Sequence, residues 1–147
     1  MSNDRTGGKI VVGVDGSEGA DRALRFAVEE AGRRGATVVA VLVWALLDQP
    51  GVPEERRFDP GFGDAEAGAY VDAAIQRAVG DHPGVPISPV VVCDLPARGL
   101  LNAAEDADLV VVGARGLGGF AGLLLGSVSQ QVVHHAPCPV IVIPAAP

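Results

Sequence analysis

Five short apolar runs alternate with segments of helical periodicity along the chain. The runs are predicted strands and span about residues 9–15, 36–44, 86–93, 108–113 and 139–143. The intervening segments repeat apolar residues at helical spacing and predict helices over about residues 20–34, 67–79, 96–106 and 127–135. Strands that alternate with helices form right-handed βαβ crossovers around a parallel sheet. The sequence therefore predicts a three-layer α/β, Rossmann-like fold with a parallel five-stranded sheet.

Length and composition fit a single domain that spans residues 1–147. Hydrophobic residues make up 48% of the chain but aromatic residues only 4%, so Val, Ala and Leu are expected to form the core. Residues 48–63 are rich in Pro, Gly and charge, and we expect a linker there, either a mobile lid or a disordered tether. Pro89 predicts an edge position for the third strand. Tyr70 belongs to the apolar stripe of the second helix.

Charge and residue usage exclude several functions. The net charge is −7, the pI is about 4.8, and Lys9 is the only lysine. This composition argues against a nucleic-acid surface and against Schiff-base chemistry. No apolar run approaches the roughly 20 residues of a membrane span, and the first residues lack the apolar core of a signal peptide. We expect a cytoplasmic protein without a membrane partner, in which Cys93 and Cys138 are reduced, buried thiols.

A glycine-rich stretch separates the fourth strand from the last helix. Its spacing is Gly113, two residues, Gly116, nine residues, then Gly126-Ser127. Glycine lets backbone amides approach an anion closely, and a helix N-terminus adds free amides, so the predicted ligand is a phosphate. A Walker A loop is excluded because no lysine follows these glycines. The dinucleotide pattern Gly116-x-Gly118-x-x-Ala121 lacks the acidic residue expected about 20 positions later.

This spacing resembles that of the ATP-binding universal stress proteins. Leu125-Gly-Ser-Val-Ser129 and Ala136-Pro-Cys-Pro-Val140 resemble the same family in order and distance. The resemblance covers nearly the whole chain except residues 48–63. It implies an adenine nucleotide α-hydrolase-like fold that binds ATP, with Mg2+ to offset the phosphate charge. It also implies a homodimer that pairs through the C-terminal strand, Cys138–Ile143.

The candidate nucleotide-binding residues lie at the carboxyl ends of the predicted strands and in the glycine stretch. They are Gly13, Asp15, Val43, Gly113, Ala114, Arg115, Gly116, Leu117, Gly118, Gly126, Ser127 and Val128. Asp15 either closes its turn by accepting a hydrogen bond from Ser17 or contacts a ribose hydroxyl or a metal. Ser127 either caps its own helix, as the capping-box pattern Ser127-x-x-Gln130 suggests, or contacts the ligand. Adjacent histidines, His134 and His135, are expected to be structural rather than metal ligands.

The expected function is a nucleotide-dependent regulatory switch in a stress response, read by an unidentified protein partner. No histidine, lysine or glutamate stands in the glycine stretch as a general base, so no catalytic residue is assigned. Arg115 is the only cation in that stretch, and the nine-residue spacer has none. Two alternatives remain open: a nucleotide-free dimeric scaffold of the same fold, and a slow ATPase or adenylating enzyme.

Overall fold

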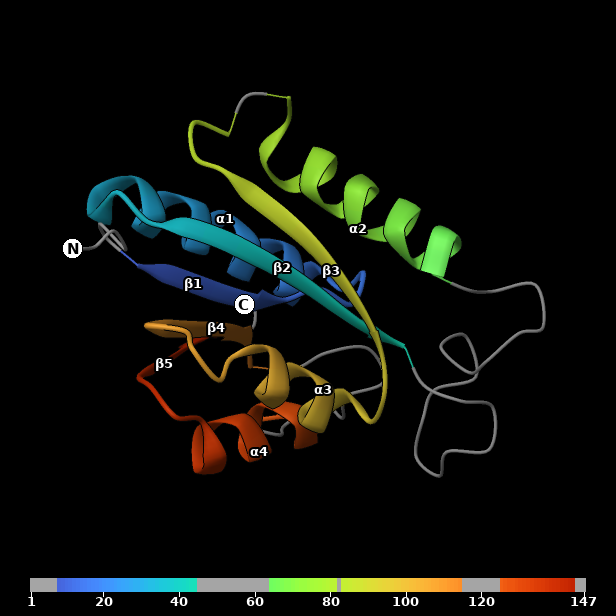
Figure 1. Ribbon diagram of the computed structural model, residues 1–147, viewed down its shortest axis with the longest axis vertical. Coiled ribbons are helices and arrows are strands. Elements are labelled where there is room, and N and C mark those ends of the chain that lie inside the picture. Colours follow the sequence, from blue (N-terminus) through green and yellow to red (C-terminus); the bar gives the residue numbers. More distant parts are fainter. Residues whose placement is uncertain (1–7, 45–63, 82, 115–124, 145–147) are drawn as a thin grey trace.

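The computed structural model describes residues 8–44, 64–81, 83–114 and 125–144, and it forms one parallel sheet with the strand order β3-β2-β1-β4-β5 (Figure 1). The strands are β1 (Lys9–Gly13), β2 (Thr37–Trp44), β3 (Ile87–Cys93), β4 (Leu109–Gly113) and β5 (Val140–Ile143). The helices are α1 (Glu18–Arg34), α2 (Asp64–Val79), α3 (Pro96–Ala103) and α4 (Ser127–His135). The predicted α/β fold with a parallel five-stranded sheet is confirmed.

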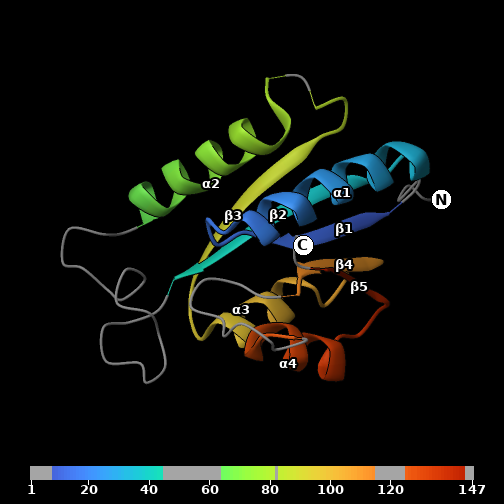
Figure 2. The same cartoon turned by 180° about the vertical axis from the view of Figure 1, so that it is seen from behind.

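Two pairs of helices enclose the sheet. Helices α1 and α2 cover one face, and α3 and α4 cover the other (Figures 1 and 2). Successive residues of a strand point to opposite faces, so Ile10 and Val12 join the core under α1 and α2, while Val11 joins the core under α3 and α4. This two-sided burial explains why the strands are apolar runs rather than alternating patterns.

Strand β1 lies at the centre and pairs with both β2 and β4. Its residue Ile10 is in register with Val38 of β2 and with Leu109 of β4. The sheet is built outward from β1 in two directions, so the chain winds one way for β2 and β3 and the other way for β4 and β5. In open α/β sheets, ligands bind beyond the carboxyl ends of the strands at such a switch point. The first and fourth strands are thus neighbours in the sheet.

Strand β3 forms one edge of the described sheet, as Pro89 predicts. Its last residue, Cys93, is exposed, so the expectation of two buried cysteines is wrong for this residue. The edge position explains the exposure, because no further strand of the described sheet covers the outer side of β3. Cys138 is half-buried, and the two cysteines do not form a disulfide with each other. None of the described helices combines the length and the apolar character that a membrane span needs.

Helix α1 is defined by caps at both ends. Ser17 is the N-cap, and its hydroxyl oxygen accepts a hydrogen bond of 3.1 Å from the Ala20 amide. Gly35 ends the helix in the left-handed conformation, with φ of 69°. A two-pronged ion pair joins α1 to α2: the Arg77 guanidinium donates to both carboxylate oxygens of Asp21, at 2.6 and 3.0 Å.

Candidate functional site

The turn after β1 is closed by its own carboxylate. Asp15 Oδ1 accepts hydrogen bonds from the Ser17 amide at 2.8 Å and from the Ser17 hydroxyl at 2.5 Å. Gly16 has φ of +83°, a conformation that side chains other than glycine rarely adopt. Of the two alternatives for Asp15, turn closure is thus confirmed and ligand contact stays a prediction. The carboxylate is fixed at the carboxyl end of β1 beside the first turn of α1.

Two strand-terminal glycines allow close packing at this edge of the sheet. A Cβ atom on Gly113, at the end of β4, would lie 2.9 Å from the carbonyl carbon of Gly19 in α1. A Cβ atom on Gly13, at the end of β1, would lie 3.3 Å from a methyl carbon of Leu100 in α3. The absence of side chains at Gly113 and Gly13 therefore brings helices from both layers close to the ends of the central strands.

The two ends of the glycine stretch are fastened to each other. The Gly126 amide donates to the Ala114 carbonyl at 2.6 Å, and the Ala114 amide donates to the Ile143 carbonyl of β5 at 2.8 Å. In addition, the buried Ser129 hydroxyl donates to the Gly113 carbonyl at 2.5 Å. The described residues that flank the stretch, Ala114 and Gly126, therefore lie against each other at the N-terminus of α4.

Ser129 is a residue that the sequence reasoning missed. Its hydroxyl bonds the first turn of α4 to the end of β4, so it joins the two elements that flank the glycine stretch. The available signal was the Ser-x-Ser spacing within Leu125-Gly-Ser-Val-Ser129. A serine that is only 4% exposed must satisfy its hydroxyl group internally, but the sequence does not reveal that burial.

Of the two alternatives for Ser127, the capping role is wrong, and contact with a ligand stays a prediction. Gly126 is the N-cap of α4, with φ of −74° and ψ of 170°, and Ser127 is the first residue of the helix and is exposed. A capping-box serine must precede the helix, so Ser127 lies one position too late for that role. No side chain of the described residues caps α4. The amides of its first turn and the Ser127 hydroxyl therefore lie at a helix N-terminus suited to an anion.

Val43 lies at the carboxyl end of β2 with its side chain in the core. It is 8% exposed, and a Cβ atom on Gly99 of α3 would come within 2.8 Å of it. A contact between Val43 and a ligand would therefore involve its backbone. Val128 of α4 is half-buried and packs on the core under α3 and α4.

Eight of the candidate residues thus lie at one edge of the sheet, where β1, β2 and β4 end (Figures 1 and 2). They are Gly13, Asp15, Val43, Gly113, Ala114, Gly126, Ser127 and Val128. The other four, Arg115, Gly116, Leu117 and Gly118, fall outside the described residues, as does the linker 48–63. The arrangement combines backbone amides, a hydroxyl group and one carboxylate, which suits binding of a phosphorylated ligand with hydroxyl groups.

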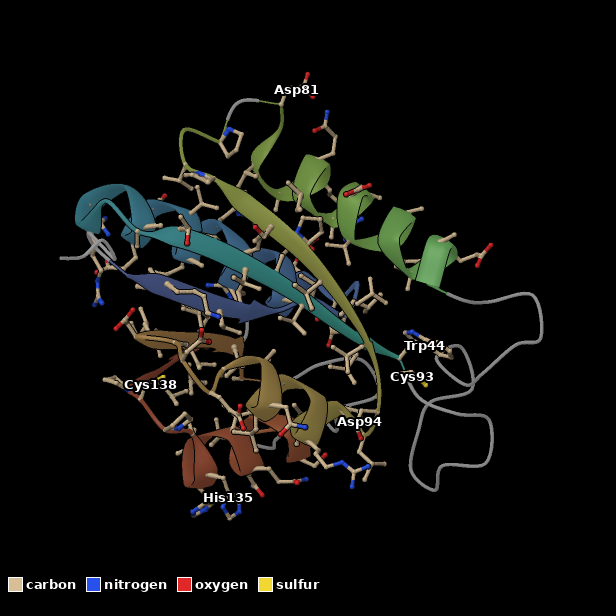
Figure 3. All side chains as sticks on the ribbon, viewed as in Figure 1. Trp44, Asp81, Cys93, Asp94, His135 and Cys138 are labelled. Carbon is tan, nitrogen blue, oxygen red and sulfur yellow. The ribbon has the colours of Figure 1, made fainter. Side chains whose placement is uncertain are left out.

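Charged groups near the end of β3 neutralise each other. The Arg98 guanidinium lies 2.7 Å from Asp94 and lowers the pKa of that carboxyl group, and the Leu95 amide also donates to it. In Figure 3, Asp94 lies beside Cys93 and Trp44 at this rim. Within the described part of the chain, no group of three or more His, Cys, Asp or Glu side chains could hold a metal ion. His134 and His135 are exposed at the far end of α4, with ring centres 6.3 Å apart.

Sequence comparison identifies the family. The model of the universal stress protein family matches residues 7–144. The universal stress protein Rv2005c of Mycobacterium tuberculosis is 42% identical over 139 residues, covering 90% of this chain and 44% of that protein. The chain thus spans less than half the length of the curated relatives it matches.

Solved structures agree with this match. The universal stress protein UspA from Lactobacillus plantarum has a TM-score of 0.73 and 32% identity, covering 96% of this chain and 99% of that one. A universal stress protein in complex with cAMP has a TM-score of 0.67 and 28% identity, over 92% of this chain and 95% of that one. The Archaeoglobus fulgidus protein in complex with dAMP has a TM-score of 0.63 and 29% identity, over 92% and 96%. This chain belongs to the universal stress protein family.

Proposed function

We propose that this chain binds ATP, with Mg2+, at the carboxyl edge of β1 and β4 and acts as a nucleotide-dependent regulatory switch in a stress response. The observation that carries the proposal is the pair of hydrogen bonds, Gly126–Ala114 and Ser129–Gly113, that joins the residues flanking the glycine stretch at the N-terminus of α4. The relatives solved with cAMP and with dAMP support an adenine nucleotide.

Each part of this edge has a chemical role in the proposal. The first-turn amides of α4 and the Ser127 hydroxyl donate to phosphate oxygens, which the positive end of the helix dipole also favours. The Asp15 carboxylate accepts a hydrogen bond from a ribose hydroxyl, and the backbone of Val43 borders the base. Arg115 is the sequence's one cation in the glycine loop, so most phosphate charge must be offset by amides and by a cation.

The residues present fit a magnesium ion that arrives with the nucleotide. Mg2+ is held in such sites mainly by substrate phosphates, with one or two protein carboxylates. The ion would neutralise phosphate charge. Because its main ligands come from the nucleotide, this role is compatible with the finding that no metal-binding cluster occurs among the described residues.

The switch that we propose acts through the loop ends. Ala114, at one end, is bonded to Ile143 of β5, and Gly126, at the other end, is the N-cap of α4. A nucleotide that binds the loop better in one arrangement favours that arrangement and shifts the position of α4. In this proposal, a protein partner binds the arrangement of α4 that the nucleotide favours. We also propose that a second copy of the chain pairs along β5, an edge strand of apolar, half-buried residues.

Calorimetric titration with ATP, with and without Mg2+, tests the proposed function. We expect micromolar binding by the native chain and binding at least about tenfold weaker by Ser127→Ala, since one hydrogen bond to a charged group is lost. Ser88→Ala, an exposed serine of β3, is the matched control and should bind like the native chain. A folded native chain that gives no saturable heat would contradict the proposal and favour the nucleotide-free scaffold. Phosphate release in the same samples would indicate an ATPase.

A further inference from the structure

An aromatic side chain of α2 lies beside the turn that holds Asp15. Tyr70 is 56% exposed, more than the other exposed large hydrophobic residues, Leu95 and Val133. A Cβ atom placed on Gly16 would lie 3.6 Å from the ring carbon Cε1 of Tyr70, which is an ordinary contact distance. The sequence periodicity predicts that Tyr70 faces the core, and this prediction is wrong. The ring instead borders the carboxyl edge of the sheet.

The position of this ring is fixed by the packing of its helix. Ala67, Val71 and Ala74 of α2 are almost completely buried against the core. Two turns after Tyr70, Arg77 donates two hydrogen bonds to the Asp21 carboxylate of α1, and Asp21 is only 8% exposed. The α1–α2 layer is therefore held together next to the Asp15 turn, which fixes the position of the Tyr70 backbone there.

The chemistry of the edge differs from one layer to the other. The helix N-terminus suited to phosphate belongs to α4, in the α3–α4 layer. Tyr70 belongs to the α1–α2 layer, and its ring offers a flat apolar surface with a polar tip. Such a surface attracts a base or a sugar ring and gives a phosphate group little. A ligand that spans the edge would meet its phosphate partners on one side and this ring on the other.

We propose that Tyr70 is a positioning residue of the nucleotide site, whose ring packs against the nucleoside part of the ligand beside Asp15. The proposal rests on the nucleotide-binding function proposed above. It explains why an aromatic side chain is exposed at this rim in a chain with few aromatic residues. It also predicts selection of nucleoside phosphates over inorganic phosphates, because only the former carry a group that the ring can contact.

Calorimetry of the full chain with ATP and with inorganic triphosphate tests this inference. Tyr70→Ala should weaken ATP binding about tenfold, a size typical of the loss of one aromatic contact to a base. Tyr70→Phe keeps the ring and should stay within about twofold of the native chain. Triphosphate binding should be the same in all three proteins. Gln76→Ala, another exposed position of α2, is the control, and thermal unfolding checks that each variant is folded.

Tyr70 is the only tyrosine, so its ring protons give one identifiable set of NMR signals in tyrosine-labelled protein. We expect these signals to shift on addition of ATP and not of triphosphate. Equal ATP affinities for the native chain and Tyr70→Ala, or ring signals that ATP leaves unchanged, would overturn the inference while the nucleotide-binding function stands. Absence of ATP binding to the native chain would overturn both.

Discussion

The amino and carboxyl edges of the sheet are built in different ways. At the amino edge, the Asp108 carboxylate accepts a 2.8 Å hydrogen bond from the Lys9 amide, and the Lys9 ammonium group pairs with Asp106. At the carboxyl edge, backbone groups bond to each other, as Gly126 does to Ala114, and glycines end both central strands. Side chains bond to the backbone at both edges, since the Ser129 hydroxyl donates to the Gly113 carbonyl at the second one. The second edge adds close backbone packing at two glycines and a helix N-terminus, which favours a ligand there.

The largest effect that this comparison predicts is on stability at the carboxyl edge. Gly113→Ala should lower the free energy of unfolding by about 2–3 kcal/mol, because the new methyl group would lie 2.9 Å from backbone of α1 that cannot move independently. Urea unfolding followed by the fluorescence of Trp44, the only tryptophan, measures this loss.

Gly68→Ala is the matched control for that variant. Nothing lies within 4 Å of a Cβ atom at Gly68, inside α2, so alanine there should stabilise the protein by about 0.5–1 kcal/mol. If Gly113→Ala proved as stable as the native chain, the close approach of β4 and α1 would not be required by the fold.

Serine and aspartate side chains allow a direct comparison of the two edges. Ser129→Ala removes the bond to the Gly113 carbonyl, and Asp108→Ala removes the bond to the Lys9 amide. Each should lower the free energy of unfolding by about 1 kcal/mol. Only Ser129→Ala should also weaken ATP binding, by about threefold, because it loosens the glycine loop. Equal ATP affinities for the two variants would remove the proposed link between loop closure and binding.

A smaller effect is expected from the ion pair of the amino edge. The Lys9 side chain is 27% exposed and that of Asp106 69%, so water and salt screen their attraction. Asp106→Ala should change the free energy of unfolding by less than about 0.5 kcal/mol. It should leave ATP affinity unchanged. A loss above 1 kcal/mol in urea unfolding would mean that the amino edge depends on this ion pair.

The alkylation rates of the two cysteines compare two sides of the sheet in the native chain, without a substitution. Cys93 ends β3 and is exposed, whereas Cys138 lies just before β5, the strand on the opposite side of the sheet (Figure 3). Burial raises the pKa of the Cys138 thiol, and the negative charge of Asp108 raises it further. Because the thiolate is the reactive form, alkylation of Cys138 at neutral pH should be slower than that of Cys93 and should accelerate as the pH rises. Peptide mass analysis of iodoacetamide-treated protein measures both rates, and equal rates at pH 7 would contradict this assignment.

Much of the fold could be predicted because its signals are local. Apolar runs and helical periodicity identify the strands and helices, and the two-sided burial of β1 and β4 makes those runs continuous. Pro89 even indicates which strand lies at an edge. The turn closed by Asp15 and Ser17 follows from residues two positions apart.

The features that sequence reasoning missed depend on distant parts of the chain. The bond from Ser129 to Gly113 spans 16 residues, and the Asp21–Arg77 pair spans 56. Tyr70 fits the helical apolar period, but its place beside Gly16 depends on where α2 crosses the end of the sheet. The N-cap of α4 is Gly126, one residue before the serine that the capping-box alternative placed there, because helix ends are weakly specified by sequence.

The most direct test of the nucleotide site is an ATP titration in the presence of Mg2+ followed by backbone amide NMR of the native chain. The account predicts saturable shifts concentrated at the carboxyl edge, at Gly13, Asp15, Ala114 and the first turn of α4, with the amides of Lys9 and Asp108 unchanged. Saturable shifts centred on the amino edge, or a spectrum that ATP leaves unchanged, would contradict it.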